Sequence, residues 1–220
     1  MDVIFIVTMI NIPNKHISVQ ESTKNFIKQH DREHCCILDA GAGVRAQTRK
    51  DALKKASYVS VDIDQNYNIS AVADIHFLPF KDSSFDAVIC TQVLEHIRDP
   101  IRSCEELHRV MKSGGFVFIT LPFVWREHAK PVDFWRFTSF GCYNLLKEAG
   151  LSHIEIVSNG GYFIVLDYIL RRLGYRLFGQ TFGRVIAILY KPIGLMLYCL
   201  DKLFPHNDFS INFSVTAAKE

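Results

Sequence analysis

An apolar segment near the start of the chain ends in an acidic residue and two glycines, a combination that suits ligand binding at the end of a strand. The apolar segment CILDAGAG, residues 36–43, leads into Asp39 and then into Gly41 and Gly43. The glycines can adopt positive φ and let the main chain approach a ligand, and a following helix would direct free N–H groups to the same place. With Ala46 at the third position and Asp62 about 20 residues further on, the spacing satisfies the dinucleotide fingerprint, which indicates a nicotinamide- or flavin-dependent oxidoreductase as one interpretation.

The carboxylate of Asp39 argues against that interpretation. It stands two residues before the first glycine, close to where the pyrophosphate of a dinucleotide would bind. Two anions near one helix N-terminus repel each other, whereas a cofactor with a cation at this end would be attracted. The sequence therefore favours a cationic, phosphate-free cofactor.

The elements that would position these residues alternate between strands and helices. We expect strands at 35–39, 58–63, 69–74, 85–92 and 115–123, a surface helix at 18–33, and further helices at 47–56, 100–111 and 139–149. Near-continuous apolar strands in this alternation predict a mainly parallel sheet that helices cover on both faces. Ligands of such sheets bind beyond the carboxyl ends of the strands, where the strand order reverses. Asp39, Asp62, Asp74 and the segment 91–96 should therefore gather at one edge.

Composition bounds the remaining function classes. The chain has 220 residues, 49% of them hydrophobic, and a formal net charge of +2, which gives no electrostatic footprint for nucleic acid. The six cysteines lack CxxC spacing, so we expect a reduced, cytoplasmic compartment. The nine histidines show neither HxH nor HExxH spacing, and no metal site is predicted. The apolar segment 1–10 is too short to span a bilayer and makes a poor signal peptide.

Four stretches taken jointly resemble the class I S-adenosylmethionine-dependent methyltransferases, in particular the methyltransferase type 11-like domain. These are ILDAGAG, VSVDID, ADIHFLPFKDSSFDAVICTQVLEHIRDP and EELHRVMKSGGFVFITLP, and the resemblance covers roughly residues 35–155. It implies an α/β fold with a Rossmann-like, doubly wound, mostly parallel seven-stranded sheet. The last strand of that sheet would be antiparallel, which fits the alternating segment 211–217.

The resemblance also implies a cofactor, S-adenosyl-L-methionine, and a role for each matching residue. Asp39, Gly41 and Gly43 would line its methionine end, Asp62 would accept both ribose hydroxyls, Asp74 with Ile75 would contact the adenine, and Thr91, Gln92 and Glu95 would lie beside the methionine moiety and the reaction centre. The chain departs from the commoner pattern at Val44, where a small residue often stands. Asp64 is a second acid beside Asp62, although motif alignment and strand alternation favour Asp62.

Methyl transfer demands little covalent participation from the protein, but an oxygen acceptor can need a base. The sulfonium is an activated leaving group, so proximity and orientation can supply about 7–11 kcal/mol of the barrier. His96 is one candidate base, since an unperturbed imidazole titrates near pH 6.5; His128 and Asp133, after the strand at 115–123, are others. Each has a structural alternative, as a helix-start histidine or as part of a packed aromatic loop. Arg136 would hold an anionic acceptor or form a surface salt bridge.

We expect a single methyltransferase domain over residues 1–220. It would comprise an N-terminal segment and helix (1–34), a cofactor-binding core (35–158), an apolar, basic helical insertion (159–206) and the last strand (207–220). The expected reaction is methyl transfer to an oxygen of a small-molecule, sugar or lipid-linked (glycan) acceptor. The rival is a non-catalytic binding or membrane-associated protein that keeps the fold.

The segment 161–204 adds a second hypothesis about location. Its basic residues are Arg171, Arg172, Arg176, Arg184, Lys191 and Lys202, against the two acids Asp167 and Asp201. The apolar run 185–200 falls short of the ~20 residues that a spanning helix needs. An amphipathic segment at the inner face of an anionic membrane, a lid over the acceptor site and a dimer interface are the interpretations left open; the oligomeric state is not predicted.

Overall fold

The computed structural model of the protein describes residues 18–205 and 208–220, and the side chains of residues 180–188 are outside the described set. The predicted segment at 1–10 and the side chain of Arg184 therefore lie outside the described residues. The strands are β1 (Cys36–Ala40), β2 (Ser57–Asp62), β3 (Ala71–Val72), β4 (Phe85–Thr91), β5 (Met111–Pro122), β6 (Ser152–Asn159) and β7 (Asn212–Ala218). The helices are α2 (Val19–His30), α3 (Ala46–Asp51), α4 (Pro100–Val110), α5 (Ser139–Glu148), α6 (Tyr162–Leu189) and α7 (Lys191–Leu203), with short turns η1 (Gly43–Arg45) and η2 (Leu94–His96).

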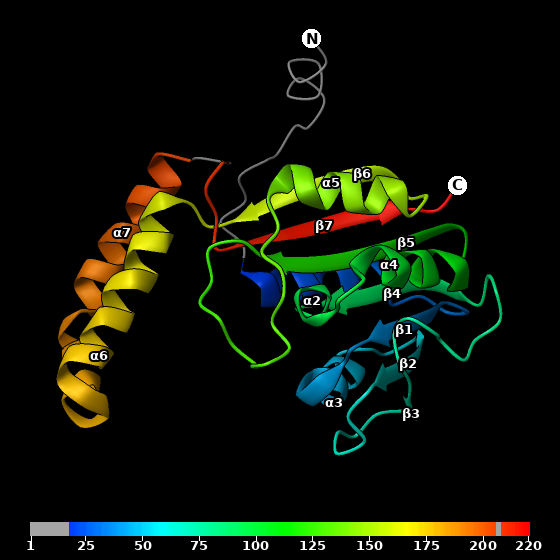
Figure 1. The fold of residues 1–220 in the computed structure, drawn as a ribbon, viewed down its shortest axis with the longest axis horizontal. Helices are drawn as coiled ribbons and strands as arrows, with labels where there is room; N and C mark the ends of the chain where they lie inside the picture. Colours follow the sequence, from blue (N-terminus) through cyan, green and yellow to red (C-terminus); the bar gives the residue numbers. More distant parts are fainter. Residues whose placement is uncertain (1–17, 206–207) are drawn as a thin grey trace, which may run out of the picture.

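The described strands form one seven-stranded sheet in the order β3-β2-β1-β4-β5-β7-β6 (Figure 1). Neighbours from β3 to β5 pair in parallel, and β7 pairs antiparallel with both β5 and β6. The predicted mostly parallel sheet with an antiparallel last strand is confirmed. The strand order reverses between β1 and β4, so the carboxyl ends of these two strands define the expected binding crevice.

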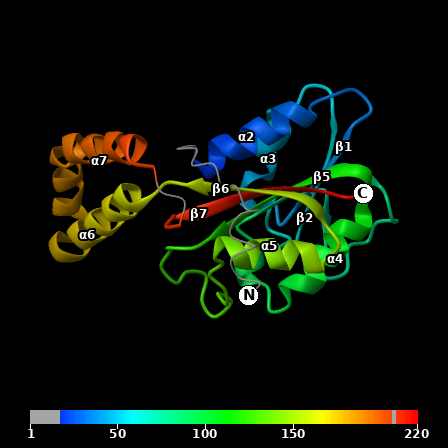
Figure 2. The same cartoon turned by 90° about the horizontal axis from the view of Figure 1, so that it is seen from above.

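Helices cover both faces of the sheet and bury two apolar layers. Figure 2 shows α2 and α3 on one face, with α4 and α5 on the other. On the α4–α5 side Leu107 and Leu146 are fully buried, and on the α2 side Phe26 packs with Ile37 and Phe118. Each such side chain stabilises the fold by roughly 1.5–3 kcal/mol relative to exposure. This two-sided burial holds the strand ends rigidly in place.

The caps of the helices follow from side chains that the sequence places at their starts. Ser18, Asp99 and Thr138 each accept a hydrogen bond from a backbone N–H of the first turn, at 3.2, 3.1 and 3.0 Å. Asp99 caps α4, with Pro100 in its first turn, where the missing N–H of proline costs no helical hydrogen bond. These caps set the direction in which α2, α4 and α5 leave the site edge.

For three of the elements, the difference from the predicted extent has a local physical reason. The helix expected at 47–56 ends at Asp51 because the carboxylate of Asp31 accepts the N–H groups of residues 54–56. β3 is reduced to two residues on the sheet edge. β5 begins at Met111 rather than at 115, because residues 112–115 bulge out between the pairs Phe85–Met111 and Ala87–Phe116.

The helices α6 and α7 form a hairpin between β6 and β7 that projects from the end of the sheet (Figures 1 and 2). A buried acid of α7, Asp201, accepts the N–H groups of Gly161 and Phe163 at 2.8 and 3.0 Å and so caps the start of α6. A break at Gly179, with φ 69° and ψ 178°, interrupts α6. In the part of the chain that the structure describes, none of the helices has the length and apolarity to cross a bilayer.

Candidate functional site

The glycine turn after β1 sits directly against the end of β2. Gly41 has a φ of +73°, and a Cβ at this position would collide with the side chain of Val93. Gly43, with a φ of +53°, donates its N–H to Oδ2 of Asp62 at 2.9 Å. Both conformations are ones that side-chain-bearing residues rarely adopt. The turn therefore holds main chain and carboxylate together at the crevice.

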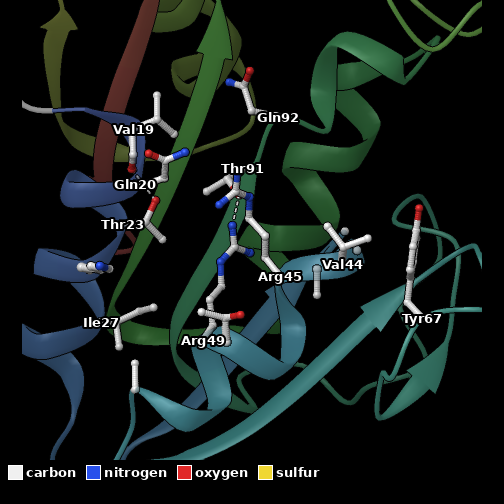
Figure 3. Close-up of a pocket in the computed structure, with 16 residues that line it drawn as sticks. Val19, Gln20, Thr23, Ile27, Val44, Arg45, Arg49, Tyr67, Thr91 and Gln92 are labelled. Carbon is white, nitrogen blue, oxygen red and sulfur yellow. Dashed lines mark hydrogen bonds between the residues drawn. The ribbon is translucent and has the colours of Figure 1, made fainter.

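A pocket of about 530 Å³ opens at this turn (Figure 3). Its volume is in the range of small-molecule sites. Gly41, Gly43 and Tyr67 line it on one side, together with Thr91 and Gln92 at the end of β4. The structure thus brings together four of the residues predicted to contact the cofactor, and the carboxylate of Asp62 adjoins them through Gly43.

The first turns of α2 form the opposite wall of this pocket, which the sequence analysis missed. Val19, Thr23 and Ile27 line it from the helix that was expected only as a surface element. Their spacing of four residues places them on one helix face. That periodicity is the signal by which the wall could have been found.

The two acids after β2 have different tasks. Asp62 accepts the N–H groups of Gly43 and Asp64, at 2.9 and 3.0 Å, and a carboxylate with about four lone-pair sites keeps capacity for further donors. Asp64 is engaged by Asn66, whose backbone and side-chain nitrogens donate to it at 2.9 and 2.7 Å. Asp62 therefore faces the pocket turn, and Asp64 stabilises the loop that follows.

The predicted adenine pair lies outside the lining of this pocket. Asp74 accepts hydrogen bonds from the backbone and ring nitrogens of His76, at 2.9 and 2.7 Å, and these bonds lower the pKa of its carboxyl. Ile75 is buried in the core. Their contact with an adenine stays a prediction.

Asp39 is fully buried and paired, which corrects the physical argument made from the sequence. Arg49 donates to its two oxygens at 2.7 and 2.8 Å, and the Tyr58 hydroxyl donates to it at 2.5 Å. Burial raises the pKa of the Asp39 carboxyl, and both partners counter that effect. Because Arg49 neutralises its charge, Asp39 does not offer a free carboxylate to a cationic cofactor.

Arg49 itself lines the pocket, together with two other basic residues, Lys24 and Arg45. Figure 3 shows it pointing at Thr91, to whose hydroxyl it donates a short hydrogen bond. Nothing in the motif spacing pointed to this residue, since its pairing with Asp39 depends on the packing of α3 against β1. Asp39 thus acts on the site through Arg49.

The end of β4 carries backbone strain. Gln92 has a φ of 56°, which is uncommon for a residue with a side chain, and its amide donates to the hydroxyl of Thr120 at 3.2 Å. Such conformations cluster at functional sites. The turn from β4 into η2 therefore keeps an energetically unfavourable backbone conformation at Gln92, which the hydrogen bond to Thr120 helps to hold.

A second group of polar residues lies just beyond Gln92. Glu95 is fully buried, and both its carboxylate oxygens lack a hydrogen-bond partner among the described residues. Burial raises the pKa of its carboxyl to about 7. The Glu95 carbonyl accepts the N–H groups of Phe134 and Trp135, at 2.8 and 3.2 Å, and so fastens the loop after β5 onto η2.

Two histidines complete this second group. Nδ1 of His96 lies 2.6 Å from the Val132 carbonyl, and its Nε2 lies 3.8 Å from Oε1 of Glu95. The rings of His96 and His128 meet edge to face, with centroids 4.7 Å apart. Burial lowers the pKa of the His96 imidazole, which favours its neutral form at pH 7. Asp133 lies 4.0 Å from Nδ1 of His96 and 3.4 Å from Nδ1 of His128, so the structure brings together all three predicted base candidates, beside Glu95.

Asp133, the third candidate, is tied to Arg136. Arg136 donates to its two oxygens at 2.7 and 2.8 Å and spends its other three N–H groups on the carbonyls of Trp125, Arg126 and Trp135. All five donors of the guanidinium are then used. The arginine also holds the pKa of the Asp133 carboxyl far below its usual range. This pair folds the loop, so Arg136 has no donor left for an anionic acceptor and Asp133 is poorly suited as a base.

Comparisons with known proteins bear on the family of the chain. Residues 38–119 match the family model described as a methyltransferase domain. An uncharacterized methyltransferase of Schizosaccharomyces pombe is 38% identical over 68 residues, which are 31% of this chain and 24% of that protein. The ubiquinone biosynthesis O-methyltransferase of Azotobacter vinelandii is 29% identical over 114 residues, 44% of this chain and 48% of that protein. The chain thus spans less than half the length of these two curated relatives.

A solved structure shows that the fold is shared. Phosphoethanolamine N-methyltransferase 2 of Haemonchus contortus, in complex with S-adenosyl-L-methionine, aligns with a TM-score of 0.57 at 18% identity. The alignment covers 90% of this chain and 52% of that one.

Proposed function

We propose that this chain, which belongs to the class I S-adenosylmethionine-dependent methyltransferases, transfers the methyl group of its cofactor to an oxygen of a small-molecule, sugar or lipid-linked acceptor. One observation carries the proposal: Gly41, Gly43 and Asp62 meet at the crevice between β1 and β4, beside a pocket of about 530 Å³. When bound, the cofactor supplies an activated methyl group on a sulfonium. The protein has to bind it, orient it and admit the acceptor.

The residues around the glycine turn and its pocket fit this cofactor. The open glycine turn leaves room for a ligand against the main chain, since a Cβ at Gly43 would meet nothing closer than 3.8 Å. Asp62 would hold the ribose hydroxyls through charge-assisted hydrogen bonds, which are roughly twice as strong as neutral ones. Thr91 and Gln92 would adjoin the methionine moiety, with Arg49 fixed beside them. Asp74 and Ile75 would complete the adenine end.

A second pocket supports an acceptor that is both apolar and anionic. It has about 590 Å³ and lies between the loop after β5 and helix α6. Phe123, Ile169 and Leu173 contribute apolar surface, and Arg172 and Arg176 contribute charge. Such a lining suits a lipid-linked phosphate or an acidic glycan precursor. The name of the O-methyltransferase relative supports oxygen as the acceptor atom.

His96 and His128 are the groups best placed to take a proton from an acceptor hydroxyl. They lie at the crevice edge, one in η2 and one in the loop after β5. A neutral imidazole can serve as a general base near pH 7. Loss of turnover with retained cofactor binding in His96→Ala or His128→Ala would show that the substituted histidine takes part in the reaction.

The cofactor assignment is tested by isothermal titration with S-adenosyl-L-methionine. We expect binding by the wild type and at least tenfold weaker binding by Asp62→Ala, because a hydrogen bond to a charged group contributes about 1.5–3 kcal/mol. Asp64→Ala is the matched control, since that acid serves the loop. No binding by the wild type, or unchanged binding by Asp62→Ala, would overturn the assignment.

The rivals make different predictions. A non-catalytic protein with this fold would bind the cofactor without turnover of labelled methyl groups into any component of a cell extract. An oxidoreductase would bind a nicotinamide cofactor, which a fluorescence titration would detect.

Contact of the α6–α7 hairpin with an anionic membrane is a second candidate function, and it would place the protein peripherally at the cytoplasmic face. The observation that favours it is the gathering of exposed apolar side chains beside basic ones. Leu177, Leu195 and Leu203 are 64–71% exposed. Lys202 directly precedes Leu203 in the sequence. Interfacial helices combine these two features. A lid or a dimer interface would use the same surface.

Flotation with anionic liposomes tests this second function. We expect the wild type to float and Leu177→Glu/Leu195→Glu to remain in solution, because the charges oppose insertion at the interface. Val72→Glu, an exposed apolar position on the sheet edge, is the control. A wild type that does not float, or a double variant that floats equally well, would contradict the membrane contact.

A further inference from the structure

Three side chains that could ligate a cation converge at the crevice edge from segments far apart in the sequence. Glu95 and His96 belong to η2, and His128 belongs to the loop after β5. One potential ligand atom from each lies within 4.8 Å of the others. No spacing motif links His128 to the other two, so this convergence is a product of the fold.

The carboxylate of Glu95 is the first sign of a missing partner. It is fully buried, and neither oxygen has a hydrogen bond among the described residues. An uncompensated buried charge is strongly unfavourable, so natural proteins pair such groups or use them to coordinate metals. Arg136 cannot neutralise Glu95 by a hydrogen bond, because all five of its N–H groups donate to Asp133 and to loop carbonyls.

The hydrogen bond of His96 presents the other ring nitrogen to the cluster. A carbonyl oxygen can only accept, so Nδ1, which lies 2.6 Å from the Val132 carbonyl, carries the proton. In the neutral ring Nε2 then offers a lone pair, and it is the atom 3.8 Å from Oε1 of Glu95. Metal-binding histidines are commonly oriented by such a bond from the other nitrogen to a backbone carbonyl.

His128 offers a second unsatisfied atom. Its Nδ1 is buried without a hydrogen bond among the described residues, although Oδ2 of Asp133 lies 3.4 Å away. Its backbone N–H donates to the same oxygen at 2.7 Å, which fixes the residue on the loop. Backbone hydrogen bonds thus hold Glu95, His96 and His128 in place, while both carboxylate oxygens of Glu95 and Nδ1 of His128 have no hydrogen bond among the described residues.

We propose that Glu95, His96 and His128 bind a divalent first-row transition metal ion, with zinc the best match to their chemistry. Two imidazole nitrogens and one carboxylate are a ligand set of catalytic zinc sites, which leave a further position open. Magnesium and calcium prefer oxygen ligands, so two imidazoles disfavour them. The site stands on its own geometry, and only its use in catalysis rests on the proposed function. With the metal bound, His96 and His128 would act as ligands rather than as bases, and an acceptor hydroxyl in the open position would lose its proton to solvent more readily.

Metal titration of the full-length, chelator-stripped protein tests the site. Zn²⁺ binding is measured by competition with a chromophoric chelator, and Co²⁺ serves as a spectroscopic probe of the ligands. We expect one equivalent per chain, with cobalt d–d bands and no thiolate charge-transfer band. Glu95→Gln and His128→Ala should each weaken binding at least tenfold, since even residues behind the ligands cost about 10–100-fold. His153→Ala, an exposed histidine away from the cluster, is the control and should bind as the wild type does.

Thermal melting supplies a second measurement that does not depend on activity. Zn²⁺ should raise the melting temperature of the wild type and of His153→Ala but not of Glu95→Gln, because a ligand stabilises only a state that binds it. No binding by the wild type, a thiolate band in the cobalt spectrum, or binding that survives both substitutions would overturn the site. Titration with S-adenosyl-L-methionine keeps the two proposals apart. A protein that binds the cofactor but no metal refutes the metal site alone, and the reverse result refutes the proposed cofactor site alone.

Discussion

Asp39 and Glu95 are both fully buried acids near the crevice, yet their surroundings are opposite. Asp39, at the end of β1, has a guanidinium and a phenol as partners. Glu95, in the turn after β4, has no hydrogen bond to its carboxylate among the described residues. A buried carboxylate with hydrogen-bond partners stabilises the fold, whereas a buried carboxylate without them lowers its stability. The contrast distinguishes an acid that stabilises the fold from one for which we propose a ligand.

The largest expected effect comes from breaking the satisfied pair. Arg49→Ala leaves Asp39 as an uncompensated buried charge, and removing one partner of such a pair typically costs about 3–5 kcal/mol. We expect the free energy of unfolding, measured by urea denaturation, to fall by that amount. Lys50→Ala, at the exposed neighbouring position, should change it little. A loss no larger than that of the control would mean that Asp39 needs no partner.

The second effect has the opposite sign. Glu95→Met replaces an unpaired buried carboxylate by an apolar side chain of similar size. In metal-free protein at pH 8 we expect the free energy of unfolding to rise by about 1–3 kcal/mol, because the desolvation penalty of the charge disappears. Glu105→Met, at an exposed position of α4, is the control. A decrease in stability would show that Glu95 has a stabilising partner after all.

The smallest effect concerns His30, a buried group with one backbone partner. Burial lowers the pKa of its imidazole. The hydrogen bond between Nδ1 and the Phe26 carbonyl, 2.8 Å long, offsets part of this lowering. The native state then binds fewer protons than the unfolded state just below pH 6.5, so stability falls as the pH drops through this window. We expect this fall to be smaller in His30→Gln when unfolding is followed from pH 7 to pH 5. Equal slopes in both proteins would exclude His30 as the acid-sensitive group.

Much of the sheet could be predicted because the strands carry their own signals. Apolar runs ending in Asp39 or Asp62 mark strands whose carboxyl ends meet at one edge, and the structure places both there. The glycine turn was equally readable, since Gly41 and Gly43 need conformations that other residues avoid. These inferences depend on chain-local properties, which a sequence records directly.

The pairing of side chains across the fold could not be predicted in the same way. The guanidinium that neutralises Asp39 comes from a different element, and nothing in its spacing distinguishes Arg49 from the basic residues around it. The meeting of His128 with Glu95 depends on the path of the loop after β5, which Arg136 and Asp133 determine through tertiary contacts. Side-chain partners set whether a buried acid is structural or reactive, so its role stays open until the fold is known.

The attachment of the α6–α7 hairpin gives the molecule a modular character. β6 and β7 are antiparallel neighbours, and the last residue of one, Asn159, pairs with the first of the other, Asn212. The two helices therefore occupy the place of a hairpin loop whose ends already meet within the sheet. Because loop length costs little free energy, the pairing of β6 with β7 sets no length on the segment between them. The fold can therefore carry a long helical segment at this place while the crevice at the ends of β1 and β4 keeps its geometry.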